Sequence, residues 1–178
     1  MTAVTCYLGL GANLDQPDQQ LRQALLALNS TPGIKLTGWS SFYRSKPVGP
    51  QDQPDYVNAV AQISTTLAPL DLLDQLQAIE QHQGRVRLRR WGERTLDLDL
   101  LLYANQPIQH PRLTVPHVEM CNRLFVIQPL AELVPDCHLP DGTPVHAILS
   151  TLAGQDELIT IPTPTRLELL PQAPAVDS

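Results

Sequence analysis

Residues 94–102 read Arg-Thr-Leu-Asp-Leu-Asp-Leu-Leu-Leu, and this alternation of apolar and acidic side chains predicts a β-strand. Successive side chains of a strand point to opposite faces, so Asp97 and Asp99 share one face while the neighbouring leucines turn toward a core. Two adjacent carboxylates repel each other unless a positive charge lies between them. Mg²⁺ usually takes one or two protein carboxylates and completes its shell with water and phosphate oxygens. The strand therefore predicts a site for a divalent cation.

A cluster of arginines precedes this strand. The chain has only twelve lysines and arginines and a net charge of -6, yet five arginines fall within residues 85–94. The planar guanidinium fork suits phosphate oxygens. Either feature alone favours a solvated loop with ordinary salt bridges, whereas the two in this order favour a polyphosphate site with its metal ions. The five residues are Arg85, Arg87, Arg89, Arg90 and Arg94.

Length and composition restrict the class of protein. A chain of 178 residues with 43% hydrophobic residues is long enough for one domain with a real core. It contains no apolar run of about 18 residues and begins with no secretory signal, so we expect no membrane association and a cytoplasmic location. Three cysteines without a CxxC pair fit a reducing compartment. The acidic balance argues against nonspecific nucleic-acid binding.

The remaining periodicity predicts an α+β fold, a ferredoxin-like β-α-β-β-α-β sandwich with additional C-terminal helices. Residues 1–160 form a single domain in this interpretation, and the Pro-rich residues 161–178 form a mobile tail. A loop is expected at 105–116. Strands are predicted at 4–10, 34–43, 56–67 and 94–102, helices after Pro17 and Pro69, and further helices at 122–133, interrupted at Pro129, and 144–152.

Five motifs, in this order and spacing, resemble a known enzyme family. They are residues 11–14 (GANL), 41–45 (SFYRS), 49–58 (GPQDQPDYVN), 90–99 (RWGERTLDLD) and 113–117 (LTVPH). The chain is similar to 6-hydroxymethyl-7,8-dihydropterin pyrophosphokinase, the folate-pathway enzyme that moves pyrophosphate from ATP to a pterin alcohol and releases AMP. Two departures from the family are Lys46, where proline is common, and Val118, where members often carry an aromatic residue. The arginine loop also looks about one residue shorter than in familiar members.

The resemblance implies a role for each matching position, with ATP and the pterin as partners, two Mg²⁺ ions as cofactors and a monomeric enzyme. Asp97 and Asp99 hold the metals and, with Arg85 and Arg94, form the catalytic set. The nucleotide and its phosphates are bound by Gln77, Glu80, Arg87, Arg94, Thr114, His117 and Arg123. The pterin is bound by Ser45, Val48, Tyr56, Asn58, Trp91 and Phe125, with Tyr56 and Phe125 as the aromatic pair. Arg85 and Arg90 belong to a mobile loop that closes over the site.

Three other interpretations remain open. Ferredoxin-like sheets also bind RNA, but these strands lack closely spaced aromatic residues, and Asp97 and Asp99 would repel a nucleic-acid backbone. A noncatalytic interaction domain that docks through the arginine loop is the second. A zinc site is the third, although its four residues match no standard ligand spacing. They are His117, Cys121, Cys137 and His138.

Overall fold

The computed structural model describes residues 2–13, 16–45, 55–84, 96–152, 154 and 158–164. The helices are α1 (Pro17–Ser30), α2 (Pro69–Gly84), α3 (Leu124–Leu133) and α4 (Val145–Thr151), with a short 3₁₀ turn, η1 (Met120–Asn122). The strands are β1 (Val4–Ala12), β2 (Ile34–Trp39), β3 (Phe42–Ser45), β4 (Tyr56–Thr65), β5 (Asp97–Tyr103), β6 (Ile108–His110), β7 (Leu113–Val115) and β8 (Ile159–Ile161). Predicted positions outside the described residues are Lys46, Val48, Arg85, Arg87, Arg89, Arg90, Trp91 and Arg94.

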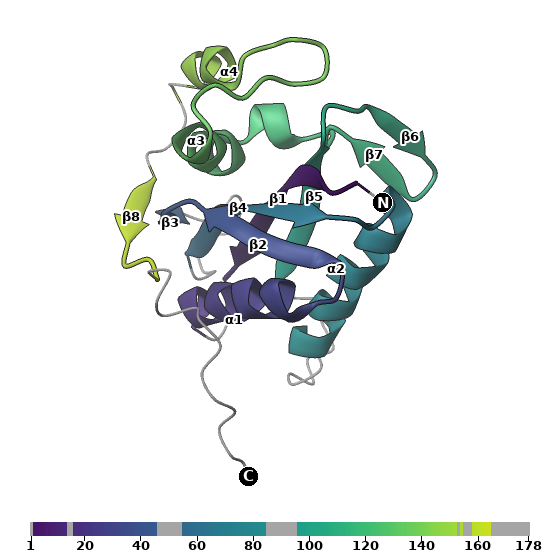
Figure 1. Cartoon of the computed structure of the whole chain (residues 1–178). Helices are drawn as coiled ribbons and strands as arrows, with labels where there is room; N and C mark the ends of the chain where they lie inside the picture. The colour runs from purple at the N-terminus through teal and green to yellow at the C-terminus, as the bar shows by residue number, and fades with distance from the viewer. Residues whose placement is uncertain are drawn as a thin grey trace.

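One antiparallel sheet organises the molecule. Its strand order is β5-β1-β4-β3-β8, and β2 pairs with β4 beside β3. Helices α1 and α2 cover one face, and α3 and α4 lie over the other (Figure 1). Leu8, Leu10 and Leu98 point into the larger core under α1 and α2, whereas Val60 and Leu101 pack with α3 and α4. The predicted α+β, ferredoxin-like arrangement is confirmed.

The predicted second strand is divided into β2 and β3 by an irregularity at Ser40. Its N–H donates to the carbonyl of Val60 at 2.8 Å, and its hydroxyl oxygen accepts the N–H of Val60 at 2.9 Å. A side chain thus replaces one backbone partner of the ladder. The break re-aims the following residues, as β-bulges do, and sets the face on which Tyr43 lies.

Two other regions differ from the sequence-based expectation. The expected loop at 105–116 contains the hairpin of β6 and β7, which were too short for the periodicity to reveal. The helix expected from residue 122 begins at Leu124, after η1. The expected interruption at Pro129 is wrong: α3 is continuous from Leu124 to Leu133, although Pro129 cannot donate a hydrogen bond to the carbonyl four residues earlier. Burial of Ile127 and Leu130 holds this helix in place.

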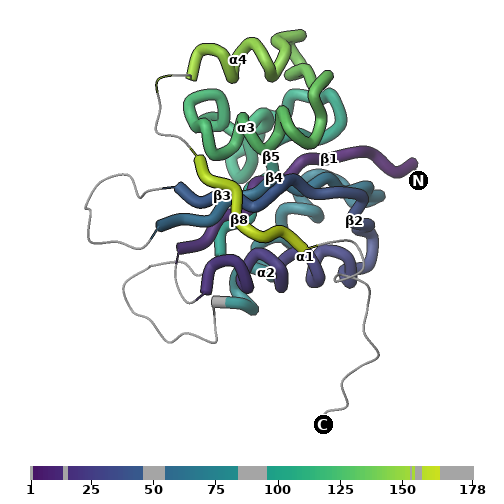
Figure 2. The backbone as a smooth tube through the Cα atoms, turned by 90° about the vertical axis from the view of Figure 1, so that its left-hand side faces the viewer, coloured from purple at the N-terminus to yellow at the C-terminus, as the bar shows by residue number. Residues whose placement is uncertain are grey.

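The C-terminal segment stays packed beyond the expected domain boundary at residue 160. Strand β8 pairs antiparallel with β3 and lies along that edge of the sheet (Figure 2). Beyond it, the hydroxyl of Thr163 accepts the N–H of Phe42 at 2.8 Å, and the carbonyl of Pro164 accepts the indole N–H of Trp39 at 3.1 Å. Residues 161–164 thus belong to the fold, and the rest of the expected tail lies outside the described residues.

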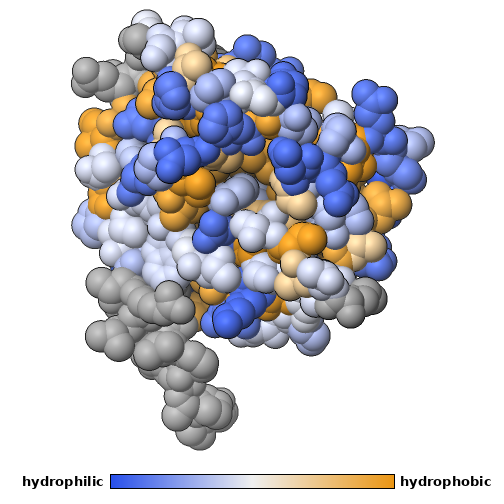
Figure 3. Space-filling view, turned by 45° about the horizontal axis from the view of Figure 1, so that its top comes forward, coloured by the Kyte–Doolittle hydropathy of each residue, from blue (hydrophilic) through white to orange (hydrophobic). Residues whose placement is uncertain are grey.

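Within the described part of the chain, no helix is long and apolar enough to span a bilayer. Hydrophobic side chains on the face shown in Figure 3 lie in separate patches among hydrophilic ones.

Candidate active site

Four directly paired residues form a row across the sheet. Tyr43 pairs with Asn58, Asn58 with Gly11, and Gly11 with Asp97. Directly opposed residues of antiparallel strands point to the same face, so these side chains share the face that carries α3. The neighbouring row brings Gly9 opposite Asp99. Gly11 therefore separates Asn58 from Asp97, and Gly9 separates Val60 from Asp99, so β1 contributes no side chain at these two positions.

Gly11 makes the position of Asn58 possible. A Cβ at residue 11 would lie 2.7 Å from Nδ2 of Asn58, closer than atoms can pack. Asn58 is buried, at 8% exposed, and its Oδ1 accepts the hydroxyl of Ser45 at 3.4 Å. Tyr56 precedes Asn58 by two residues, shares its face and is half-buried. The structure thus brings three of the predicted pterin residues together.

Asp97 and Asp99 lie as the alternation predicted. Both are half-buried on β5, two residues apart, and each faces a glycine of β1. Among the described residues, no group of three or more His, Cys, Asp or Glu side chains could hold a metal. Two carboxylates on an open face are nevertheless the oxygen donor set that Mg²⁺ takes when substrate phosphates complete its shell.

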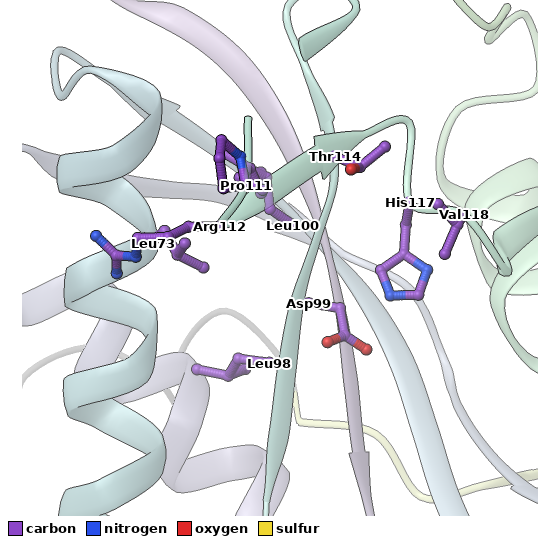
Figure 4. A pocket seen from close by; sticks show the side chains of 10 residues that line it. Leu73, Leu98, Asp99, Leu100, Pro111, Arg112, Thr114, His117 and Val118 are labelled. Carbon is purple, nitrogen blue, oxygen red and sulfur yellow. The ribbon is translucent and has the colours of Figure 1, made fainter. Parts of the chain in front are cut away.

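A pocket of about 300 Å³ lies along the outer edge of β5. Leu73 of α2 lines it, with Asp99 and its neighbours on β5 and residues 111–114, 117 and 118. Asp99 and His117 both line this pocket, and Figure 4 shows them in the same part of the view. The backbone N–H of Leu98 donates to Oε2 of Glu80 at 2.7 Å. Because the N–H and C=O of one strand residue point to the same side, the polar backbone of Leu98 faces away from β1, toward the pocket side.

The orientation of His117 is set by the backbone. Its N–H donates to the carbonyl of Leu101 at 3.2 Å, and its Nδ1 accepts the N–H of Glu119 at 3.2 Å. Because Nδ1 is an acceptor here, the proton of the neutral ring is on Nε2. His117 can therefore donate a hydrogen bond from the nitrogen that the backbone leaves unused.

Arg112 is a pocket residue that the sequence-based interpretation missed. Its Nη2 lies 2.7 Å from Oδ1 of Asp74 and 3.3 Å from Oε1 of Gln77, one of the predicted nucleotide residues. Thr114, also predicted, is exposed on β7 and lines the same pocket. The position of Arg112 directly before the 113–117 motif was the available signal.

The other predicted residues lie at the start of α3. Arg123 directly precedes the helix, and its guanidinium carbon stands 5.6 Å from the ring centroid of Phe125, a cation–π distance. Phe125 is half-buried against the core of α3 and α4. The described site residues therefore come from three parts of the fold. Ser45, Tyr56 and Asn58 lie together on β3 and β4, and Arg123 and Phe125 lie at the start of α3. Around the β5 edge lie Asp97, Asp99, Thr114 and His117, with Glu80 bonded to Leu98 and Gln77 bonded to Arg112.

Comparison with known proteins decides the family. The sequence profile of the 7,8-dihydro-6-hydroxymethylpterin-pyrophosphokinase (HPPK) family matches residues 7–135. The chain belongs to this family. It is 57% identical over 150 residues to the 2-amino-4-hydroxy-6-hydroxymethyldihydropteridine pyrophosphokinase of Haemophilus influenzae, covering 84% of this chain and 94% of the relative. The Pseudomonas aeruginosa enzyme of the same name is 54% identical over 144 residues, covering 81% and 89%.

Solved structures show the same fold. A crystal structure of HPPK-DHPS from Plasmodium falciparum matches with a TM-score of 0.65 and 14% identity over 85% of this chain, which spans 44% of that longer chain. An HPPK-DHPS crystallised with substrates matches with a TM-score of 0.68 and 12% identity, covering 85% of this chain and 45% of the other. The expectation drawn from the five motifs is confirmed: the chain is a pyrophosphokinase.

Proposed function

We propose that this member of the HPPK family transfers pyrophosphate from ATP to the hydroxymethyl group of 6-hydroxymethyl-7,8-dihydropterin, releasing AMP, on the open sheet face between Asn58 and Asp97. The observation that carries this proposal is the row Tyr43–Asn58–Gly11–Asp97. Strands are about 4.8 Å apart, so Asn58 and Asp97 stand roughly 10 Å apart across a glycine. A flat heterocycle held at Asn58 would reach toward the Asp97 carboxylate past Gly11, where β1 has no side chain.

The pterin half of the site suits a flat polar ring. The amide of Asn58 offers a donor and an acceptor to the ring edge. Because the Ser45 hydroxyl occupies one side of Oδ1, the amide is held in one orientation. Tyr56 and Phe125 supply aromatic faces. The backbone of Val48 and the indole of Trp91 remain predicted contributors.

The β5-edge pocket suits the nucleotide. Leu73, Leu98 and Leu100 give it apolar walls for a base, and the backbone polar groups of β5 lie at its edge. Gln77, Glu80 and Thr114 line the nucleoside in this proposal. The phosphates would extend toward His117, which lines the pocket with Asp99, and toward Arg123 at the start of α3. Arg87 and Arg94 are proposed to complete the phosphate contacts.

Asp97 and Asp99 would hold Mg²⁺, and two ions are proposed. When bound, such ions neutralise the phosphate oxygens and stabilise the attacking and leaving oxygens of an in-line displacement. The chain's own contribution is positional. Asn58 and the aromatic residues orient the pterin hydroxyl, and His117 Nε2–H and the arginines hold the triphosphate, so that the β-phosphorus faces the hydroxyl. Arg85 and Arg94 are proposed to stabilise the charge that develops there. We also propose a monomer in the cytoplasm.

A product assay tests the proposed function. The protein is incubated with ATP, Mg²⁺ and 6-hydroxymethyl-7,8-dihydropterin, and nucleotides and pterins are separated by chromatography. AMP should rise in step with pterin diphosphate, and chelation of Mg²⁺ should stop both. ADP as the sole nucleotide product, or no pterin-dependent turnover, would contradict the proposal.

A further inference from the structure

A single carboxylate joins α3 to the start of β3. Both oxygens of Glu132 accept the backbone N–H of Ser41 at 3.1 Å. Oε2 also accepts the Ser41 hydroxyl at 2.8 Å, and Oε1 accepts the Tyr43 phenol at 2.6 Å. Hydrogen bonds to a carboxylate are stronger than neutral ones, and an O–H···O⁻ bond of this length is typical of the strong class. Glu132 is exposed, so water could solvate its carboxylate, and burial does not require these hydrogen bonds.

The phenol of Tyr43 remains a donor under ordinary conditions. Its side chain is only 5% exposed. Burial, and then the hydrogen bond to Glu132, raise the pKa of Tyr43 well above its usual value. The phenol therefore keeps its proton throughout the neutral range, and the contact between strand and helix persists.

The hydrogen bonds of Glu132 to Ser41 and Tyr43 lie beside the proposed pterin site, on the strand side and on the helix side. Tyr43 lies directly opposite Asn58 on the adjacent strand, at a spacing where side chains contact. Ser45, two residues further along the same face, holds Oδ1 of Asn58. On the helix side, Phe125 precedes Glu132 by seven residues, which is two turns, so both lie on one side of α3.

We propose that Glu132 is a positioning residue for pterin binding: by holding Ser41 and Tyr43 it fixes the aromatic face of Phe125 relative to the Asn58–Ser45 edge. This inference rests on the proposed pterin site. It assigns no contact between Glu132 and either substrate. Its action should be specific to the pterin, because the β5-edge pocket lies two strands beyond Asn58, across β1.

The test measures the two ligands separately. Glu132→Ala removes every acceptor, Glu132→Gln keeps one oxygen, and Tyr43→Phe removes one donor. The dissociation constant of the pterin should rise about tenfold in Glu132→Ala, because the hydrogen bonds to the carboxylate are lost. It should rise less in the other two variants. The dissociation constant of a nonhydrolysable ATP analogue should stay within about twofold. Asp136→Asn is the matched control, because it removes an exposed negative charge close after α3.

A ligand-free measurement separates this inference from the proposed function. The side-chain amide resonance of Asn58 should move in Glu132→Ala and Tyr43→Phe and stay in place in Asp136→Asn. Wild-type protein that binds the ATP analogue but no pterin would contradict the proposed function, while the Asn58 resonance would still decide the role of Glu132. Unchanged pterin affinity and an unmoved resonance in Glu132→Gln and Tyr43→Phe would overturn the inference. So would an equal loss of affinity for both ligands, which indicates general destabilisation.

Discussion

At the scale of single residues, the site depends on what glycine leaves out as much as on what other residues supply. Gly11 lies between Asn58 and Asp97, and a side chain there would meet the Asn58 amide, whereas Gly9 lies opposite Asp99 and Val60 with the Leu101 side chain packed against it. In the proposed site the pterin hydroxyl approaches Asp97 over Gly11, where β1 has no side chain.

Gly11→Ala should weaken pterin binding while leaving the fold intact. The added Cβ would stand 2.7 Å from Nδ2 of Asn58, so the amide must shift. The dissociation constant of the pterin, measured by titration, should rise at least about tenfold, the equivalent of one lost hydrogen-bonding group. Gly154→Ala is the control, since nothing lies within 4 Å of its Cβ. Equal pterin affinity in the two variants would argue against Asn58 as the recognition residue.

Asp99→Asn should lower turnover by about a hundredfold or more, because loss of a metal-holding charge removes several kcal/mol of transition-state stabilisation. The change keeps the volume of a half-buried side chain, so urea unfolding should differ little from wild type. Steady-state rates at limiting Mg²⁺ provide the measurement. Asp136→Asn controls for loss of one negative charge. Wild-type turnover in Asp99→Asn would exclude Asp99 as a metal ligand.

Cys6 predicts a loss of stability at high pH. The side chain is fully buried, and burial raises the pKa of its thiol from 9.0 to about 11. The native state holds this proton more tightly than the unfolded state, so the contribution is complete below pH 9 and is lost as pH rises through 11. Cys6→Ala should flatten the fall in unfolding free energy between pH 9 and 11 by about 1–2 kcal/mol. Urea unfolding at several pH values measures this free energy for both proteins. If it falls equally between pH 9 and 11 in wild type and in Cys6→Ala, the prediction is wrong.

At the scale of elements, the edges of the sheet are treated differently. Strand β8 pairs with β3, which carries Ser45 of the proposed pterin site. The outer edge of β5 instead faces a pocket, and Glu80 accepts one of its backbone N–H groups. The edge of β3 is thus paired with β8, whereas the edge of β5 has polar backbone groups beside the proposed nucleotide pocket.

Thr163→Val should destabilise the packing of the segment after β8 against β3. The Thr163 hydroxyl accepts the N–H of Phe42, a residue with no exposed surface, and valine keeps the shape but removes the acceptor. Leaving that donor unpaired should cost about 1–3 kcal/mol. Urea unfolding measures the change, with Thr160→Val, an exposed position on β8, as the control. If both variants unfold alike, the segment after β8 adds little to stability.

At the scale of the whole molecule, the proposed pterin region and the proposed nucleotide pocket lie on opposite sides of Asp97 and Asp99. The face under α1 and α2 is filled by the larger core. On the other face, α3 and α4 pack over Val60 and Leu101, and the residues near Asn58 and Asp97 lie toward the ends of their strands. This division predicts that the two substrates can be disturbed independently.

Asn58→Ala should weaken binding of the pterin but not of ATP, and Val118→Asp should weaken binding of ATP but not of the pterin. The first leaves pterin rim groups unpaired and should raise the dissociation constant of the pterin by about one to two orders of magnitude. The second places a negative charge at the mouth of the β5-edge pocket, on a side chain that is 68% exposed, and should weaken binding of an ATP analogue through repulsion of its phosphates. Calorimetric titration of each variant with each ligand tests both. Loss of ATP affinity in Asn58→Ala with pterin affinity kept would reverse the assignment.

The sequence by itself determined the properties that depend on neighbours along the chain. Alternation placed Asp97 and Asp99 on one face, helical spacing located α1 and α2, and five motifs indicated the family. Short elements such as β6, β7 and β8 have too few residues to show a period, so they were missed, and α3 began two residues later than expected because η1 precedes it.

Only the tertiary structure decided which residues meet. The row Tyr43–Asn58–Gly11–Asp97 depends on the register of three strand pairings, and a shift of one residue in any of them would turn a side chain to the other face. The partners of Glu132, 89 and 91 positions away in the chain, could not be read from local pattern for the same reason. Register is fixed by long-range burial and by the break at Ser40, and neither leaves a periodic signal in the sequence.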